Sequence, residues 1–251
     1  MSTNRRVVVE PSAEQLISVV ATMVESVICE AVARSGTCSL ALSGGTTPRG
    51  VYQHIAQTAV QAQTPWSAVS IFWGDERDVP HDNVESNYHM ATRLLLDHLP
   101  LDPHRIYPMP ADREDLDDGA AEYEETIRQV VPANDDGVPA FDLILLGMGA
   151  DGHMASLFPG SSAVEETQRL VVAPFVPVLG RRRMTFTVPL LNAARCAIVL
   201  VTGEDKAQVM HEVFTDPAAK ATRPAARIQL TDGTLIYALD AAAARQTAYA
   251  H

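Results

Sequence analysis

The hydrophobic positions of this chain follow two patterns, stripes at helical spacing and short unbroken apolar runs. Residues 11–36 carry apolar side chains at helical spacing, and Ser12 with Gln15 forms a capping box at their start. Gly36 is a typical stop signal. The pattern therefore predicts a long helix, which follows a short strand at residues 7–10.

The unbroken apolar runs predict buried strands. They lie at residues 38–45, 69–74, 141–147, 169–175, 183–189, 195–203 and 235–239. Apolar strands without polar alternation, separated by helical stretches, are typical of a mostly parallel sheet that helices cover on both faces. No internal repeat, low-complexity tract or linker divides the chain, so we expect a single domain over residues 1–251.

The polar segments between these runs contain the signals of further helices. One begins at residue 46 with a threonine cap and has Pro48 in its first turn, and another begins near Ser86. A third is expected in the middle of the acidic segment 110–140, whose charges we interpret as a solvated helix face.

Composition and charge restrict the class of protein. With 47% apolar and 20% charged residues, the sequence is that of an ordinary globular protein. The formal net charge of −12 disfavours nucleic acid as a partner, and the basic cluster at 180–184 is more typical of a loop or a small anion site. The longest apolar runs, 141–146 and 196–202, are too short to cross a bilayer, and the first residues lack a secretory pattern. We therefore expect a cytoplasmic protein without a membrane partner.

The three cysteines, Cys29, Cys38 and Cys196, lie in apolar surroundings and have no partner at metal-ligand spacing. Small buried thiols are their expected state, rather than a disulfide or a metal site. The acidic loop at 75–86 also fits no calcium or zinc spacing, so no metal is expected there.

Four polar loops follow apolar runs, at residues 43–49, 74–80, 147–153 and 202–206. In a parallel sheet, the ligand site lies beyond the carboxyl ends of the strands. Convergence of these loops on one site is the structural hypothesis from which we infer function.

The first of these loops is a glycine turn between a strand and a helix. Small residues and the free amides of a helix start favour an anion, but a plain glycine turn with a threonine cap explains the pattern equally well. The spacing does not match that of an ATP-binding P-loop. The candidate anion-binding residues are Ser43, Gly44, Gly45, Thr46 and Thr47.

Two cations stand in the second and fourth loops. Arg77 lies among carboxylates at the end of a strand, where it would contact a phosphate, stabilise a developing oxyanion or form a plain surface ion pair. Lys206 lies in the first turn of a helix expected from residue 203. A lysine there is unfavourable for the helix dipole, so it weakly indicates an anionic ligand.

The third loop has Gly147, Gly149 and Gly152 at the G-x-G-x-x-G spacing of a dinucleotide site. Such a site needs a long helix after the third glycine, whereas Pro159 and Gly160 stop any helix within two turns. Because the sequence does not predict the required helix, it does not indicate a dinucleotide site.

With a dinucleotide site excluded, Asp151 and His153 are the residues of this loop whose side chains can take part in catalysis. An imidazole is the side chain best suited to proton transfer near neutral pH, and a neighbouring carboxylate fixes its tautomer. The serines at 161–162 do not match the nucleophile elbow of serine hydrolases, so water is the expected nucleophile.

Four motifs, in order along nearly the whole chain, carry a family resemblance. They are LSGGTTPRGVY at 42–52, WGDERDVPHDNVESNY at 73–88, GMGADGHMASLFPG at 147–160 and VPLLNAARCAIVLVTGEDKA at 188–207. With these motifs the chain resembles the 6-phosphogluconolactonases, relatives of the glucosamine-6-phosphate deaminases. The resemblance implies a three-layer α/β/α fold with a mostly parallel sheet, of the deaminase and lactonase type. It also implies hydrolysis of 6-phospho-D-glucono-1,5-lactone in the oxidative pentose phosphate pathway, without a metal or an organic cofactor.

Carried over residue by residue, the resemblance makes His153 the acid/base residue that activates water, with Asp151 as its supporting carboxylate. Arg77 or the backbone amides of the 147–152 turn would then stabilise the tetrahedral oxyanion.

The resemblance assigns the sugar phosphate to the glycine turn together with Lys206 and Arg77, and Arg183 is an additional candidate. The C-terminal segment IYALD has Tyr237 where many relatives have a tryptophan, a difference that concerns packing more than chemistry.

The deaminases are the nearest alternative, because they share the glycine turn and the Asp-Gly-His triplet. They typically continue DGHIAFNEPG, with a glutamate that assists ring opening, where this chain has Leu157 and Phe158. An apolar pair cannot transfer protons, so the pattern favours the lactonase. A sugar-phosphate-binding regulator on the same fold is a non-enzymatic alternative. The expected assembly is a monomer or a weak homodimer.

Overall fold

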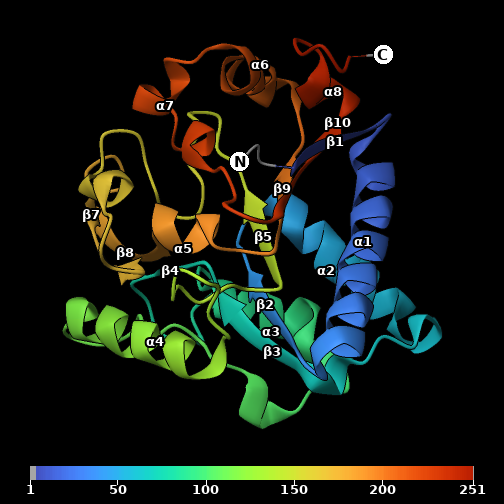
Figure 1. Cartoon of the computed structure of the whole chain (residues 1–251), viewed down its shortest axis with the longest axis vertical. Helices are drawn as coiled ribbons and strands as arrows, with labels where there is room; N and C mark the ends of the chain where they lie inside the picture. The colour runs from blue at the N-terminus through green and yellow to red at the C-terminus, as the bar shows by residue number, and fades with distance from the viewer. Residues whose placement is uncertain (1–3, 251) are drawn as a thin grey trace.

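A central parallel sheet organises the molecule. The structure, a computed structural model, describes residues 4–250 (Figure 1). Within these residues, the parallel strands run in the order β1 (Asn4–Glu10), β10 (Thr234–Asp240), β9 (Cys196–Val201), β5 (Leu143–Gly147), β2 (Cys38–Leu42) and β3 (Val69–Trp73). Strands β2, β3 and β9 are buried at every position, which explains their unbroken apolar sequences.

Helices cover both faces of this sheet and confirm the three-layer α/β/α expectation. α1 (Ala13–Ser35) and α2 (Thr46–Ala62) pack against each other and against the sheet, to its right in Figure 1. The other helices are α3 (Asn87–Leu94), α4 (Leu116–Val130), α5 (Val188–Asn192), α6 (Ala207–Thr215), α7 (Ala219–Thr222) and α8 (Ala241–Ala244). Short 3-10 turns occur at Trp66–Ala68, Leu96–His98, Pro103–Arg105, Ser162–Glu165, Glu204–Lys206 and Pro224–Arg227.

The longest helix begins and ends where the sequence predicts. The Ser12 hydroxyl accepts a hydrogen bond from the backbone N–H of Gln15 at 3.3 Å, and Gly36 closes the helix with a φ of 80°. α1 is also long and apolar enough to cross a membrane by length and composition, which the lengths of unbroken apolar runs did not reveal. Its apolar stripe, which includes Leu16 and Ile28, belongs to the hydrophobic core of the fold. A core helix meets the same length criterion.

Two of the apolar runs were expected in the main sheet, and this expectation is wrong. Runs 169–175 and 183–189 contribute to a separate antiparallel sheet of β4 (Asp75–Arg77), β8 (Arg181–Phe186), β6 (Val171–Val172) and β7 (Phe175–Val176). The physical reason is chain length. Parallel neighbours need a crossover of a dozen or more residues, whereas only a few residues separate β6, β7 and β8.

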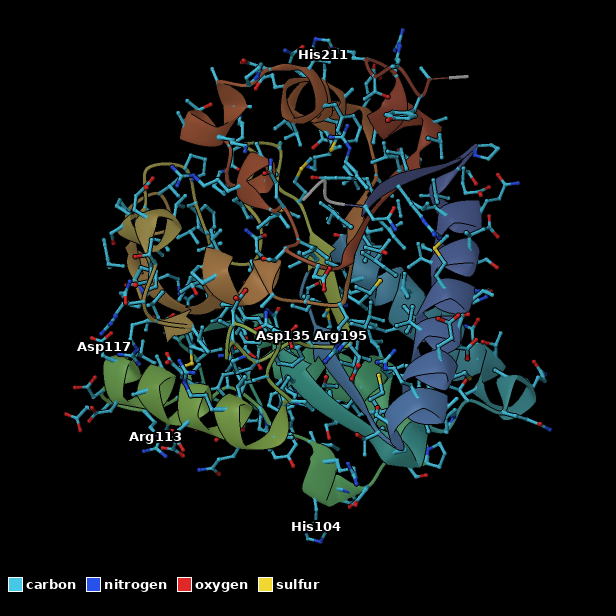
Figure 2. The ribbon with its side chains drawn as sticks, in the orientation of Figure 1. His104, Arg113, Asp117, Asp135, Arg195 and His211 are labelled. Carbon is cyan, nitrogen blue, oxygen red and sulfur yellow. The ribbon has the colours of Figure 1, made fainter. Side chains whose placement is uncertain are left out.

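The acidic segment contains the expected helix, α4, whose first turn is capped by Asp115. The charged side chains of Arg113 and Asp117 lie at the outer edge of the molecule beside it (Figure 2). The interpretation of these charges as a solvated face holds for most of them but is wrong for Glu124, which is buried and accepts hydrogen bonds from the backbone N–H groups of Leu170 and Val171.

The cysteines differ from one another in burial. Cys38 and Cys196 are buried as expected, and burial raises the pKa of the Cys196 thiol to about 11. Cys29 is exposed, so the expectation of a buried thiol is wrong there. It lies on the outer face of α1, whose buried stripe includes the neighbouring Ile28.

Candidate active site

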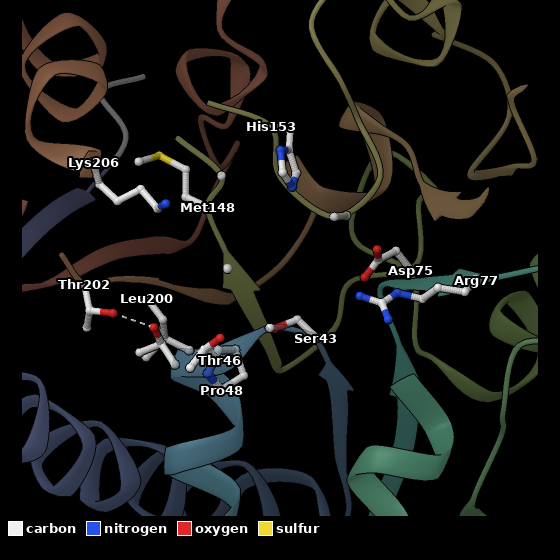
Figure 3. A pocket seen from close by; sticks show the side chains of 16 residues that line it. Ser43, Thr46, Pro48, Asp75, Arg77, Met148, His153, Leu200, Thr202 and Lys206 are labelled. Carbon is white, nitrogen blue, oxygen red and sulfur yellow. Dashed lines mark hydrogen bonds between the residues drawn. The ribbon is translucent and has the colours of Figure 1, made fainter. Parts of the chain in front are cut away.

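A hollow opens at the carboxyl ends of the central strands, where all four polar loops converge (Figure 3). Its volume is about 170 Å³. The strand order explains the convergence, because β2 lies between β3 and β5, and β5 lies between β2 and β9. The loops that follow these four strands therefore leave the sheet side by side.

Most of the site residues expected from the sequence line this hollow, namely Ser43, Gly44, Gly45, Thr46, Thr47, Arg77, His153 and Lys206. Asp151 and Arg183 are not among the lining residues. Asp151 is hydrogen-bonded to His153, and Arg183 lies opposite Arg77 in the β4–β8 register.

The glycine turn is held from below by a buried tyrosine. The Tyr52 hydroxyl accepts a hydrogen bond from the Ser43 N–H at 2.9 Å and donates one to the Ser43 carbonyl at 2.8 Å. The Ser43 hydroxyl lines the hollow, is buried and has no hydrogen-bond partner within the described part of the chain. A buried hydroxyl without a partner is suited to a ligand.

Gly44 is required by its neighbour Asn87. A Cβ atom at position 44 would lie 2.1 Å from Asn87 Oδ1, so any side chain would displace the asparagine. Asn87 Nδ2 in turn donates to the backbone carbonyl of Asp75 at 2.9 Å, which ties the glycine turn to the loop after β3.

The first turn of α2 differs from the expected threonine cap. Gly45, with a φ of 102°, is the N-cap residue, and no side chain among residues 4–250 caps the helix. Thr46 and Thr47 are the first residues of the helix, and the Thr47 hydroxyl lies 2.7 Å from that of Thr202 at the end of β9. The amides of the helix start therefore have no side-chain acceptor, which suits them to an anion.

His153 has the geometry of a general base. Its Nδ1 lies 2.6 Å from Asp151 Oδ1, and its backbone N–H donates to the same oxygen at 3.1 Å. Burial alone would raise the pKa of Asp151, but these two contacts outweigh it and leave the pKa below its usual range. The carboxylate therefore stays charged near neutral pH and orients the ring, which leaves Nε2 available for chemistry.

The ring of His153 stacks on Phe158, with a centroid distance of 4.3 Å and an interplanar angle of 25°. Leu157, the residue before it, is completely buried. The position at which the deaminase pattern has a glutamate thus holds an apolar ring against the imidazole.

The turn before His153 is closed on itself. The backbone N–H of Gly149 donates to the carbonyl of His153 at 3.0 Å, and the N–H of Gly152 donates to the carbonyl of Gly149 at 3.0 Å. These two amides are therefore not available to an oxyanion. The expectation that the backbone amides of the 147–152 turn stabilise the oxyanion is wrong for Gly149 and Gly152.

Asp75 lines the hollow, although the sequence did not single it out as a site residue. Its Oδ2 accepts a hydrogen bond from the Ser156 hydroxyl at 2.8 Å, and its Oδ1 accepts one from Asn87 Nδ2 at 3.3 Å. No group of three or more potential metal-ligating side chains occurs among residues 4–250. Asp75 follows the apolar strand β3 after a single glycine. That position could have marked it as a residue of the site.

Glu76 was also missed, because its role needs the fold. The buried carboxylate accepts hydrogen bonds from the backbone N–H groups of Asn87 at 2.7 Å and Tyr88 at 2.8 Å, and from the Ser86 hydroxyl at 2.9 Å. Burial raises its pKa, and these hydrogen bonds act against that rise. Glu76 thereby fixes the start of α3 and the asparagine beneath the glycine turn.

Arg77 and Arg183 stand side by side on paired strands. Arg77 reaches the hollow and donates to the backbone carbonyl of Glu85. Burial and the positive charge of Arg77 lower the pKa of Arg183, and one buried guanidinium nitrogen of Arg183 lacks a partner within the described residues. Arg183 therefore adds positive charge behind Arg77 without reaching the hollow.

Lys206 lies at the opposite end of the hollow from Arg77 (Figure 3). It is the last residue of the 3-10 turn Glu204–Lys206 and the N-cap residue of α6, rather than part of the first helical turn that the sequence predicts. Its side chain is largely buried and pairs with Asp205. Cations thus flank the glycine turn on both sides.

Comparisons with known proteins identify the family. Residues 11–237 match the family model for glucosamine-6-phosphate isomerases and 6-phosphogluconolactonase. The 6-phosphogluconolactonase of Synechocystis sp. is 40% identical over 213 residues, which cover 85% of this chain and 86% of the relative. The 6-phosphogluconolactonase of Streptomyces coelicolor is 36% identical over 255 residues, which cover 98% and 96%.

Solved structures extend the similarity. The 6-phosphogluconolactonase of Trypanosoma brucei has a TM-score of 0.85 and 28% identity, covering 98% of this chain and all of that one. A monomeric glucosamine-6-phosphate deaminase has a TM-score of 0.81 at 18% identity, covering 96% and 99%, and shows the shared fold alone. From the match to most of its length and the identity to these relatives, the chain belongs to the glucosamine-6-phosphate isomerase and 6-phosphogluconolactonase family.

Proposed function

We propose that the protein is a 6-phosphogluconolactonase, which hydrolyses 6-phospho-D-glucono-1,5-lactone to 6-phospho-D-gluconate. The observation that carries the proposal is the carboxylate-paired His153, which faces the same hollow as the glycine turn and Lys206. The proposal is also supported by two relatives that match most of the chain and are named 6-phosphogluconolactonase. A single domain, a cytoplasmic location, a role in the pentose phosphate pathway and a monomeric or weakly dimeric state stay predictions.

In the proposed mechanism, His153 Nε2 takes a proton from water as the water oxygen attacks the C1 carbonyl. Asp151, hydrogen-bonded at Nδ1, stabilises the imidazolium that forms. The imidazolium then gives its proton to the ring oxygen as the C1–O bond breaks. The product is the open-chain acid, and the histidine is neutral again.

Arg77 is the proposed partner of the oxyanion. It is the one arginine of the described residues that lines the catalytic hollow, and two nearby turn amides are already occupied by internal hydrogen bonds. A preorganised cation at the developing charge contributes on the order of a few kcal/mol to the transition state.

A hydrolysis assay on freshly generated lactone tests the proposed function. We expect the rate with enzyme to exceed the spontaneous opening of the lactone, which must be measured in parallel. Glucosamine 6-phosphate serves as the comparison substrate, because Phe158 occupies the position of the deaminase glutamate. Ammonia release without acceleration of lactone opening would refute the proposal in favour of the deaminase, and binding of sugar phosphates without turnover of either would favour a regulator.

Replacing Lys206 by alanine should mainly affect recognition of the phosphate. We expect the preference for phosphorylated over plain gluconolactone, measured as the ratio of kcat/KM values, to fall about tenfold, since one charge-assisted hydrogen bond is lost. Lys220, the other lysine of the chain, is exposed and lies outside the hollow, so Lys220→Ala is the matched control. An unchanged preference in Lys206→Ala would remove this residue from the phosphate site.

A further inference from the structure

A second hollow adjoins the proposed active site beyond Arg77. Its volume is about 390 Å³, and it lies between the start of α2 and the length of α3 with the loop before it. The two hollows share Gly45, Thr46 and Arg77 in their linings. The two hollows are therefore adjacent and have Arg77 in common.

The second hollow gathers cations that lack carboxylate partners. Arg49 from α2 and Arg93 from α3 line it with Arg77 and His89, and within the described residues Arg49 and Arg93 form no ion pair or side-chain hydrogen bond. Several other arginines of this acidic chain form ion pairs, such as Arg34 with Asp142, Arg223 with Glu212 and Arg227 with Glu165.

Among the described residues that line the second hollow, one has a carboxylate side chain. That carboxylate already forms an ion pair with an arginine outside the lining. Glu85 lines the hollow, but its Oε2 lies 2.9 Å from the guanidinium of Arg181. The Arg181 contact lowers the pKa of Glu85, with smaller contributions from Arg183 and Arg77. The local balance of the hollow is therefore positive, in a protein whose net charge is −12.

The proposed reaction creates an anion where the substrate has none. The lactone carries its charge only on the phosphate, whereas the open-chain product also carries a carboxylate at C1. Ring opening frees that end of the molecule to move away from His153. Arg77, which we place next to the reacting carbonyl, also lines the second hollow.

We propose that this second hollow is an oxyanion subsite, in which Arg49 and Arg93 receive the C1 carboxylate of the product. The inference rests on the proposed function for the identity of that carboxylate. A guanidinium forms bidentate hydrogen bonds with carboxylate and phosphate alike, so the same subsite accepts a free inorganic phosphate when no product is bound.

Calorimetric binding of two ligands tests the subsite. 6-Phosphogluconate carries both anionic groups, and glucitol 6-phosphate has a hydroxymethyl group in place of the carboxylate. We expect the wild-type protein to bind 6-phosphogluconate about tenfold more tightly. The double variant Arg49→Gln/Arg93→Gln should lose most of that preference, and because both side chains are exposed it should keep its thermal stability.

Arg6→Gln is the matched control, because Arg6 also lacks an ion pair within residues 4–250 but lines a separate hollow near the amino ends of the strands. It should retain the wild-type preference. In a second arm, inorganic phosphate is titrated into protein saturated with glucitol 6-phosphate. If inorganic phosphate binds the saturated wild type but not the saturated double variant, the subsite also accepts free phosphate.

Equal affinities for the two ligands in the wild type, together with no binding of inorganic phosphate to the saturated protein, would overturn the inference. A preference for 6-phosphogluconate that persists in the double variant would overturn it too. Neither measurement requires turnover. Failure of the proposed function, seen as absent lactone hydrolysis by the wild type, is therefore distinguishable from failure of the subsite.

Discussion

His153→Ala is expected to lower kcat/KM for lactone hydrolysis by about 10²- to 10⁴-fold, the usual contribution of a positioned general acid/base. The substitution removes Nε2, which we propose takes the proton from water, and leaves Asp151 with only the backbone N–H of residue 153 as a partner. The residual rate should approach the spontaneous opening of the lactone. The measurement is initial rates on freshly generated lactone, corrected for the uncatalysed reaction.

The control for this variant is His104→Ala. His104 is exposed and lies at the far edge of the molecule (Figure 2), outside the lining of the hollow. We expect wild-type activity from it. Thermal unfolding of His153→Ala should show an intact fold, because the side chain is partly exposed and its main packing partner is Phe158. Near wild-type hydrolysis by a folded His153→Ala protein would refute the proposed mechanism.

Gly149→Ala is expected to lower kcat by about 10²-fold, although the substitution adds a single methyl group and removes no proposed chemical group. A Cβ atom at position 149 would lie 2.1 Å from His153 Nδ1 and 2.7 Å from Asp151 Oδ1. The imidazole must turn away to make room, which breaks its hydrogen bond with the carboxylate. Misplacement of the base by about 1 Å is enough for an effect of this size.

Gly74→Ala separates this steric effect from a general effect of losing a glycine. A Cβ atom there would meet the Leu42 carbonyl oxygen at 3.6 Å and Phe186 at 3.9 Å, both ordinary contact distances. Gly74 is buried, but the added methyl group meets its neighbours without a clash, so we expect activity within about twofold of the wild type. Full activity of Gly149→Ala would show that the His153–Asp151 contact is not needed for catalysis.

The local pattern of the sequence was sufficient for much of the fold. Ser12 and Gly36 bound α1 as predicted, because capping and left-handed closure depend on neighbouring residues only. The strands of the central sheet were recognised by their unbroken apolar runs, since burial on both faces removes polar alternation. Antiparallel β8 has a similar run but pairs elsewhere, because pairing depends on chain connection as well as on hydrophobicity.

The site was predicted in part for a similar reason. His153, Lys206 and the glycine turn follow apolar runs. Because ligands bind beyond the carboxyl ends of parallel strands, this position predicted that they belong to a site. Asn87 and Tyr52 were not predicted, because their roles arise from contacts with Gly44 and Ser43 that no local spacing encodes.

By itself, the sequence determined the class of fold, the loops that carry chemistry and, through its four ordered motifs, the family. These properties depend on side-chain periodicity and on residue types within short segments. Only the tertiary structure decided that Arg77 reaches the hollow whereas Arg183 lies behind it, and that the amides of Gly149 and Gly152 are already used. The first outcome depends on how distant strands pair and the second on the path of the backbone through one turn, and a one-dimensional pattern specifies neither.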